Sequence, residues 1–179
     1  MKVLVAYASK YGSTKRIAEF IGEKLRNSEM NVDVKDVIST GDLAGYDAFV
    51  VGSALFMGHW MKEAKGFLSK NRAVLTSKPT WIFSSGPTGT KSTDKKGRDL
   101  LEVSGPTELD ELRSWVHPRE HKVFFGAFFA DRLKGTAALF ARMIPKDEEG
   151  DFRNWPVIES WASSIAQELA TEKQIGGKS

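Results

Sequence analysis

The start of the chain constrains its fold more strongly than any other stretch. Residues 3–6 form a short apolar run without helical periodicity, which is typical of a strand buried on both faces of a parallel sheet. A turn rich in hydroxyl side chains follows at residues 9–14. Ile17, Ile21 and Leu25 then recur at every fourth position, which predicts an amphipathic helix. The stretch therefore predicts a strand, a tight turn and a helix in direct succession.

The turn has the features of an anion-binding site. The first N–H groups of a helix lack partners and the helix dipole is positive there, so a phosphate group satisfies both. Ser9, Ser13 and Thr14 offer hydroxyl donors, and Gly12 allows a close approach of the backbone. A plain turn in which Ser13 or Thr14 caps the helix fits the same pattern. The turn alone leaves phosphate binding and simple capping open.

Four further apolar segments alternate with helical patterns. The segment 31–38 alternates with polar residues and predicts an edge strand, whereas 48–52 and 80–83 are continuously apolar and predict central strands. Residues 122–130 predict a fifth strand, with Phe128 and Phe129 near its carboxyl end. Alternating strands and helices predict an α/β fold, a doubly wound five-stranded parallel sheet with helices on both faces.

Composition narrows the class of protein. The 179 residues, 41% of them hydrophobic and 27% charged, predict one globular domain over 1–172 with a polar tail at 173–179. The absence of cysteine excludes disulfides, thiolate chemistry and iron–sulfur ligation, and fits a reducing compartment. Without a long apolar run or a signal-peptide pattern, we expect a cytoplasmic protein.

The net charge of the chain is informative about its partners and not about its fold. The net charge of +3 suits an anionic substrate or an anionic membrane surface, although a solvated surface with scattered lysines explains it equally well. We expect no nucleic-acid partner. Residues 133–144 have helical spacing and basic flanks, which fits either a helix lying on a membrane or a helix packed on the sheet.

Two loops after central strands are candidates for ligand contacts. Leu55, Phe56 and Met57 are three consecutive apolar residues where a loop is usually polar, so they either cover a flat aromatic ligand or pack on the following helix. His59 is either a hydrogen-bond donor to a ligand or a structural residue, and Trp60 is expected in the core. The loop at 84–90 has small residues whose backbone groups can meet the polar edge of a heterocycle, or it is a plain turn.

The first turn resembles the phosphate loop of the flavodoxins. The Walker and dinucleotide glycine patterns are absent, whereas Ser9-Lys10-Tyr11-Gly12-Ser13-Thr14 matches Ser/Thr-x-Thr/Ser-Gly-x-Thr except at Tyr11. The resemblance implies FMN as cofactor, with the phosphate at this turn and the ring between the two later loops. The implied cofactor-binding residues are Ser9, Lys10, Tyr11, Gly12, Ser13, Thr14, Ala54, Leu55, Phe56, Met57, Gly58, Ser85, Gly86, Pro87, Thr88 and Gly89.

A wider resemblance covers nearly the whole chain. Residues 51–59, 121–129, 131–145 and 151–155 are similar to the flavodoxin branch that contains menaquinone-dependent protoporphyrinogen IX dehydrogenase. The resemblance implies an oxidoreductase that passes electrons from a reduced substrate, such as a porphyrinogen, through FMN to a quinone. The flavin carries this chemistry, so we assign no catalytic side chain and no metal.

Two other functions remain open. The Ser84-Ser85-Gly86-Pro87 loop resembles that of ordinary flavodoxins, which favours an electron carrier or a reductase with a different donor, such as a redox partner protein. Tyr11 in the phosphate loop leaves room for a module that has lost FMN. The oligomeric state is not encoded in any of these patterns.

Overall fold

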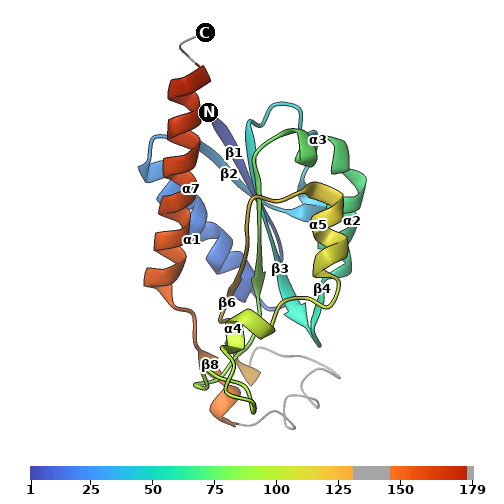
Figure 1. Ribbon diagram of the computed structural model, residues 1–179, viewed down its shortest axis with the longest axis vertical. Helices are drawn as coiled ribbons and strands as arrows, with labels where there is room; N and C mark the ends of the chain where they lie inside the picture. The colour runs from blue at the N-terminus through green and yellow to red at the C-terminus, as the bar shows by residue number, and fades with distance from the viewer. Residues whose placement is uncertain (131–145, 177–179) are drawn as a thin grey trace.

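The computed structural model describes residues 1–130 and 146–176 of the chain (Figure 1). The amphipathic segment at 133–144, assigned above to a membrane surface or to the sheet, lies outside these ranges. Within them, no helix is both long enough and apolar enough to cross a membrane.

The centre of the fold is a sheet of five parallel strands in the order β2–β1–β3–β5–β6. This confirms the predicted doubly wound sheet, with the first strand near the middle and the polar second strand at one edge. The strands are β1 Lys2–Ala8, β2 Asn31–Asp36, β3 Ala48–Phe56, β5 Thr80–Ser85 and β6 His121–Phe124.

Helices cover both faces of the sheet (Figure 1). Helices α1 Ser13–Asn27 and α7 Trp155–Gly176 pack on one face, where Val3, Val5 and Phe83 belong to one buried cluster. The opposite face, with Leu4, Ala6 and Phe49, is buried beneath the other helices. Those helices are α2 Lys62–Lys70, α3 Arg72–Ser77 and α5 Leu109–Val116. Alternate residues of one central strand thus feed two separate cores, which explains its continuous apolar sequence.

The segment after β3 differs from the predicted loop. Strand β3 continues to Phe56 and pairs antiparallel with β4 His59–Trp60, so residues 53–56 are strand and not loop. Met57 and Gly58 form the two-residue turn with positive φ angles of 52° and 78°. This is the turn geometry that matches strand twist in tight hairpins.

The fifth strand is shorter than predicted. Strand β6 ends at Phe124, and residues 127–128 form the separate strand β7 Ala127–Phe128, antiparallel to β8 Gly150–Asp151. The chain leaves the sheet because the Gly126 N–H donates to the Pro87 carbonyl (2.9 Å) and the Ala127 N–H to the Ser13 hydroxyl (2.9 Å). Hydrogen bonds to distant loops therefore replace the β5–β6 pairing that would otherwise extend the strand.

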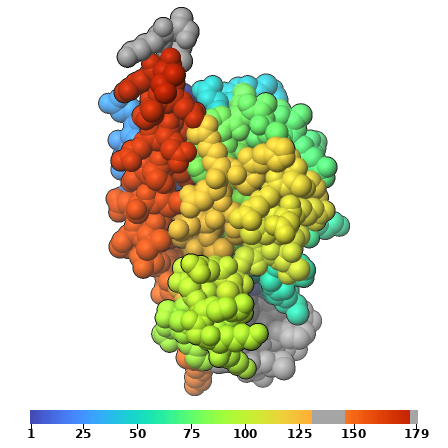
Figure 2. Space-filling model, in the orientation of Figure 1, coloured from blue at the N-terminus to red at the C-terminus, as the bar shows by residue number. Residues whose placement is uncertain are grey.

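Long-range contacts lie at the ends of two helices. No side chain caps α5, and the N–H and hydroxyl of Thr107, just before it, both donate to the Gly58 carbonyl. Helix α7 runs on to Gly176, into the segment predicted as a tail, and Arg119 pairs with Glu172, just before that segment. The short helices η1 Val37–Ser39, α4 Leu100–Val103 and η3 Lys146–Glu148 complete the fold. In Figure 2 the segment around α4 (yellow-green) projects from the lower end of the molecule.

Candidate functional site

The turn between β1 and α1 leaves hydrogen-bonding groups free for a ligand. Gly12 adopts a left-handed conformation (φ 87°), and no side chain caps the helix, so the capping role considered for Ser13 and Thr14 is wrong. Instead, the Ser9 hydroxyl accepts a hydrogen bond from the Gly12 N–H (3.1 Å) and the Ser13 hydroxyl accepts one from the Ala127 N–H (2.9 Å). The two serine hydroxyls thus bond to backbone N–H groups of Gly12 and Ala127 and do not cap the first N–H groups of α1, which are left available to a ligand.

Thr14 is the most informative residue of the turn. Its side chain is fully buried, yet its Oγ1 has no hydrogen-bond partner in the part of the chain that the structure describes. The other such atom among the described residues, Trp81 Nε1, lies in the core beneath the Arg119 guanidinium. A buried hydroxyl without a partner costs free energy, and a bound acceptor oxygen removes that cost.

A cavity of about 460 Å³ opens beside this turn. Most of the cofactor-binding residues that the flavodoxin resemblance implies line this cavity, and they come from the three predicted loops. Those residues are Ser9, Lys10, Tyr11, Ser13, Thr14, Ala54, Leu55, Phe56, Met57, Ser85, Gly86 and Thr88. The strands β1, β3 and β5 all deliver these loops at their carboxyl ends, which is where open α/β sheets bind ligands.

Four of the implied residues do not line this cavity. Gly12 lines an adjoining hollow, and Gly58 lies in the hairpin turn with its carbonyl bonded to Thr107. The Pro87 carbonyl accepts from Gly126, and a Cβ on Gly89 would lie 3.4 Å from Glu148 Cγ. The carbonyls of Gly58 and Pro87 therefore bond to neighbouring segments of the chain.

The cavity also has walls that the sequence patterns did not identify. Met61, Gly126, Ala127 and Glu148 line it. Of the two phenylalanines near the end of the predicted fifth strand, Phe128 lines it too, whereas Phe129 lines the adjoining hollow. Gly126 approaches closely, because a Cβ there would lie 3.2 Å from the Gly86 carbonyl oxygen. Only the break after β6 brings this segment over the first turn, and no local motif marks that break.

Apolar side chains of the β3–β4 hairpin stand at the mouth of the cavity. Leu55 is half-buried against the core, as its packing alternative predicted, but Phe56 and Met57 are 56% and 85% exposed. The Lys10 ammonium lies 4.5 Å from the Phe56 ring centroid and 5.3 Å from that of Tyr11. A positive charge and two aromatic rings therefore border the opening.

Glu108 ties the base of the hairpin to α5. Its carboxylate accepts hydrogen bonds from the Trp60 N–H (3.0 Å) and pairs with Lys65 (3.1 Å) and His59 Nδ1 (2.9 Å). Burial raises the pKa of this carboxyl, but the hydrogen bonds from His59, Lys65 and the backbone outweigh burial, so the pKa is lowered. His59 thus has the structural role, and the hairpin is fixed before any ligand binds.

A buried polar chain supports the hairpin from beneath. The Trp60 indole N–H donates to Ser84 Oγ (2.8 Å), and the same oxygen lies 2.8 Å from His121 Nε2. Burial, with a smaller contribution from Arg113, lowers the pKa of His121 to about 4. Trp60 is only 2% exposed, which confirms its predicted place in the core.

The lining of the cavity combines polar and apolar groups that suit a flavin phosphate. The unpaired Thr14 hydroxyl and the N-terminus of α1 are available to an anion, and Leu55, Phe56 and Phe128 provide apolar surface. A ligand with an anionic tail and a flat ring system satisfies both kinds of group.

Comparison with known proteins agrees with the resemblance to flavodoxins found in the sequence. The family model described as "Flavodoxin domain" matches residues 4–154. The chain is 28% identical over 182 residues to the protoporphyrinogen IX dehydrogenase [quinone] of Escherichia coli K12, covering 95% of each chain. It is also 28% identical over 136 residues to the flavodoxin of Maridesulfovibrio salexigens, covering 64% of this chain and 93% of that one.

Solved structures agree on the fold. A flavodoxin from the domain Archaea superimposes with a TM-score of 0.59 at 18% identity, covering 95% of this chain and 99% of the other. The chain belongs to the flavodoxin-domain family. Membership implies that it binds a flavin, FMN, as its cofactor, and the buried Thr14 hydroxyl fits the phosphate of that group.

Proposed function

We propose that this protein is an FMN-dependent oxidoreductase that passes electrons from a reduced small molecule through the flavin to a quinone. The observation that carries the proposal is the cavity of about 460 Å³, which joins an unpartnered buried hydroxyl to an apolar mouth. The likeness to a quinone-linked protoporphyrinogen dehydrogenase over 95% of both chains supports a porphyrinogen as the substrate.

In this proposal the residues around the cavity divide the work of binding FMN. Thr14, Ser13 and the first N–H groups of α1 would hold the phosphate. Leu55, Phe56 and the Ser85–Gly86 backbone would hold the ring. The bound flavin supplies the redox chemistry, because it accepts a hydride or single electrons and releases them to an acceptor.

The exposed mouth gives a substrate access to the ring. Phe56 and Met57 offer an apolar surface to a substrate, and the Lys10 ammonium beside Phe56 attracts an anionic one. A porphyrinogen is a largely apolar macrocycle that carries carboxylates, so it fits these groups.

The proposal is tested by anaerobic stopped-flow absorbance of the purified chain loaded with FMN. We expect protoporphyrinogen to bleach the flavin absorbance and menaquinone to restore it. A chain that binds FMN but is inert with this pair would lose the substrate assignment. A chain that stays colourless with excess FMN would lose the enzymatic proposal altogether.

A flavodoxin-type electron carrier is the second candidate. The tip of the hairpin favours it, because Met57 is 85% exposed and stands beside the cavity, where a redox partner protein can dock. Redox titration separates the two functions. A long-lived semiquinone over a wide range of potential indicates a carrier, whereas direct two-electron reduction indicates the dehydrogenase.

A further inference from the structure

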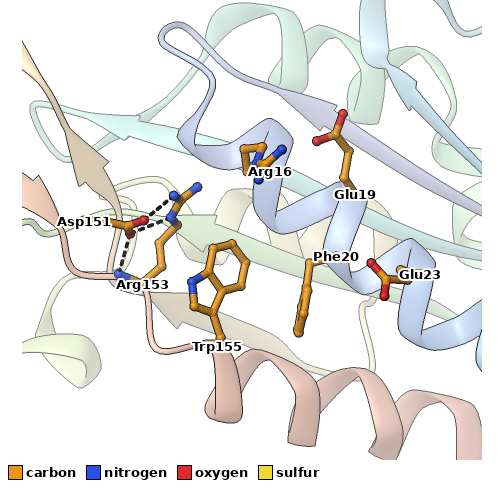
Figure 3. A pocket seen from close by; sticks show the side chains of 7 residues that line it. All are labelled: Arg16, Glu19, Phe20, Glu23, Asp151, Arg153 and Trp155. Carbon is orange, nitrogen blue, oxygen red and sulfur yellow. Dashed lines mark hydrogen bonds and ion pairs between the residues drawn. The ribbon is translucent and has the colours of Figure 1, made fainter. Parts of the chain in front are cut away.

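Two more hollows continue from the phosphate turn along helix α1. The first, of about 320 Å³, shares Tyr11, Ser13 and Ala127 with the flavin cavity. The second, of about 460 Å³, shares Arg16 and Arg153 with the first. We call this second hollow the α1 groove; it is lined by Arg16, Glu19, Phe20, Glu23, Arg153 and Trp155, with Asp151 behind Arg153 (Figure 3). The three hollows form one series that passes the turn.

The middle hollow is suited to an anion. Among the described residues, the charged side chains that line it are Arg16 and Arg153, and no carboxylate joins them. Asp151 holds Arg153 through two hydrogen bonds, one of them 2.7 Å from Nε, and the guanidinium lies 4.7 Å from the Trp155 ring centroid. Arg16 makes no ion pair in the described part of the chain. An uncommitted guanidinium therefore stands next to the phosphate turn.

The part of the α1 groove away from the phosphate turn is lined by aromatic and acidic side chains. Phe20 and Trp155 pack with ring centroids 4.9 Å apart and form its aromatic floor. Glu19 and Glu23 follow Arg16 along α1, on the side away from Arg153 (Figure 3). Their carboxylates accept hydrogen bonds, so this part of the groove suits a flat ring that carries an amino group.

We propose that the α1 groove binds the adenosine phosphate portion of a nucleotide, next to the phosphate of the flavin. The proposal rests on the flavin phosphate lying at the Ser9–Thr14 turn. A dinucleotide flavin, FAD, has its two phosphates between two flat ring systems, which is the order of the three hollows. The shared chemistry is an adenine nucleotide, either the second half of FAD or a separate molecule beside bound FMN.

In this proposal, three features of the groove contact the nucleotide. Arg16 binds the second phosphate, since it lines both the middle hollow and the groove. The Phe20–Trp155 floor supports the adenine ring, and Glu23 accepts a hydrogen bond from the adenine amino group.

Flavin fluorescence titration of the apoprotein with FMN and with FAD tests the linked arrangement. If the nucleotide is the second half of a dinucleotide flavin, FAD should bind at least 10-fold more tightly than FMN. Arg16→Gln and Glu23→Ala should each remove most of that advantage and leave FMN affinity within about twofold. Lys15→Gln is the control for net charge, because Lys15 is next to Arg16 on α1 and does not line the groove; it makes only a weak, exposed ion pair with Glu19 (3.8 Å).

Calorimetric titration of the FMN-loaded protein with AMP tests a separate nucleotide. AMP binding that Arg16→Gln weakens and Lys15→Gln does not would support the groove without linkage to the flavin. If FMN binds but FAD has no advantage and AMP does not bind, the groove proposal is overturned and the flavin function stands. If neither flavin binds, both are overturned.

Discussion

The turn after β1 and the hairpin after β3 border the same cavity but are built on opposite principles. In the turn, the Thr14 hydroxyl is buried without a partner and no side chain caps α1. In the hairpin, Glu108 and Thr107 satisfy the polar groups of the chain, and the exposed surface is the apolar Phe56 and Met57. The turn leaves a hydrogen-bonding group open to a ligand, whereas the polar groups of the hairpin are already paired within the protein.

This contrast predicts which free energy each substitution changes. Removing the unpartnered hydroxyl of the turn should affect flavin affinity more than folding, because its unmet hydrogen bond is available to the phosphate. Changes beneath the hairpin should affect folding more than flavin affinity, because its hydrogen bonds already join protein groups.

The largest effect is expected for Thr14→Val, which removes the unpartnered hydroxyl and keeps the shape. A hydrogen bond to a charged group contributes roughly 1.5–3 kcal/mol, so FMN affinity should fall roughly 10- to 100-fold. The thermal midpoint of the apoprotein should stay the same or rise, since a buried unpaired hydroxyl is lost. Fluorescence titration and thermal unfolding measure the two quantities.

Thr80→Val is the matched control for Thr14. The Thr80 side chain is also buried, but its hydroxyl donates to the Leu75 carbonyl at 2.7 Å. This variant should lose about 1 kcal/mol of folding free energy and keep its FMN affinity. Equal effects of the two valine substitutions on FMN affinity would remove the contrast between turn and scaffold.

Glu108→Ala is the next largest prediction and tests the hairpin. It leaves the Trp60 N–H and the Lys65 ammonium without their acceptor, so the free energy of unfolding should fall by about 2 kcal/mol. Urea denaturation measures the loss. Glu111→Ala, an exposed change on the same helix, should stay within about 0.5 kcal/mol of wild type.

Flavin affinity separates the hairpin from the turn in the same variant. Because Glu108 does not line the cavity, Glu108→Ala should change FMN affinity less than Thr14→Val does. The reverse order would show that hairpin position, and not the phosphate turn, dominates flavin binding.

Gly12→Ala sharpens the comparison within the turn. Gly12 has φ 87° and a Cβ there would meet no atom within 4 Å, so its cost is conformational, about 1–2 kcal/mol of folding free energy. Gly66→Ala, in helix α2 with equally open space, should instead stabilise by up to about 1 kcal/mol. Chemical denaturation of both variants checks the opposite signs, and equal signs would contradict the left-handed turn.

Sequence predicted the turn well because its chemistry is contiguous. Residues 9–14 carry the hydroxyls, the glycine and the start of the helix within one short stretch, and most of them line the cavity. The alternation of strands and helices likewise fixed the parallel sheet, since continuous apolar strands must be covered on both faces.

Sequence failed where distant hydrogen bonds decide the path of the chain. The phenylalanine-rich segment 122–130 has strand character throughout, but the strand stops at Phe124 because Gly126 and Ala127 bond to Pro87 and Ser13. Glu148 lines the cavity only because this break brings β7 alongside β8. No local pattern around Glu148 indicates such a role.

The smallest expected effect is a loss of folding stability at low pH that arises from His121, which lies beneath the hairpin. Burial lowers the pKa of His121 to about 4 in the folded chain, against roughly 6.5 in an unfolded one. Below pH 6.5 the unfolded chain therefore binds a proton that the folded chain does not, and stability falls as pH decreases toward 4. Allowing for partial contact with water, the loss between pH 7 and pH 5 should be roughly 1 kcal/mol.

His121→Gln tests the origin of this pH dependence, since glutamine does not titrate and still offers hydrogen-bonding groups to Ser84. Urea unfolding of this variant at pH 7 and pH 5 should give a flatter profile than wild type. His117→Asn removes an exposed histidine from a left-handed position that asparagine tolerates, so its profile should match wild type. If the profile of His121→Gln is as steep as that of wild type, the acid sensitivity arises elsewhere, and the buried chain beneath the hairpin does not set it.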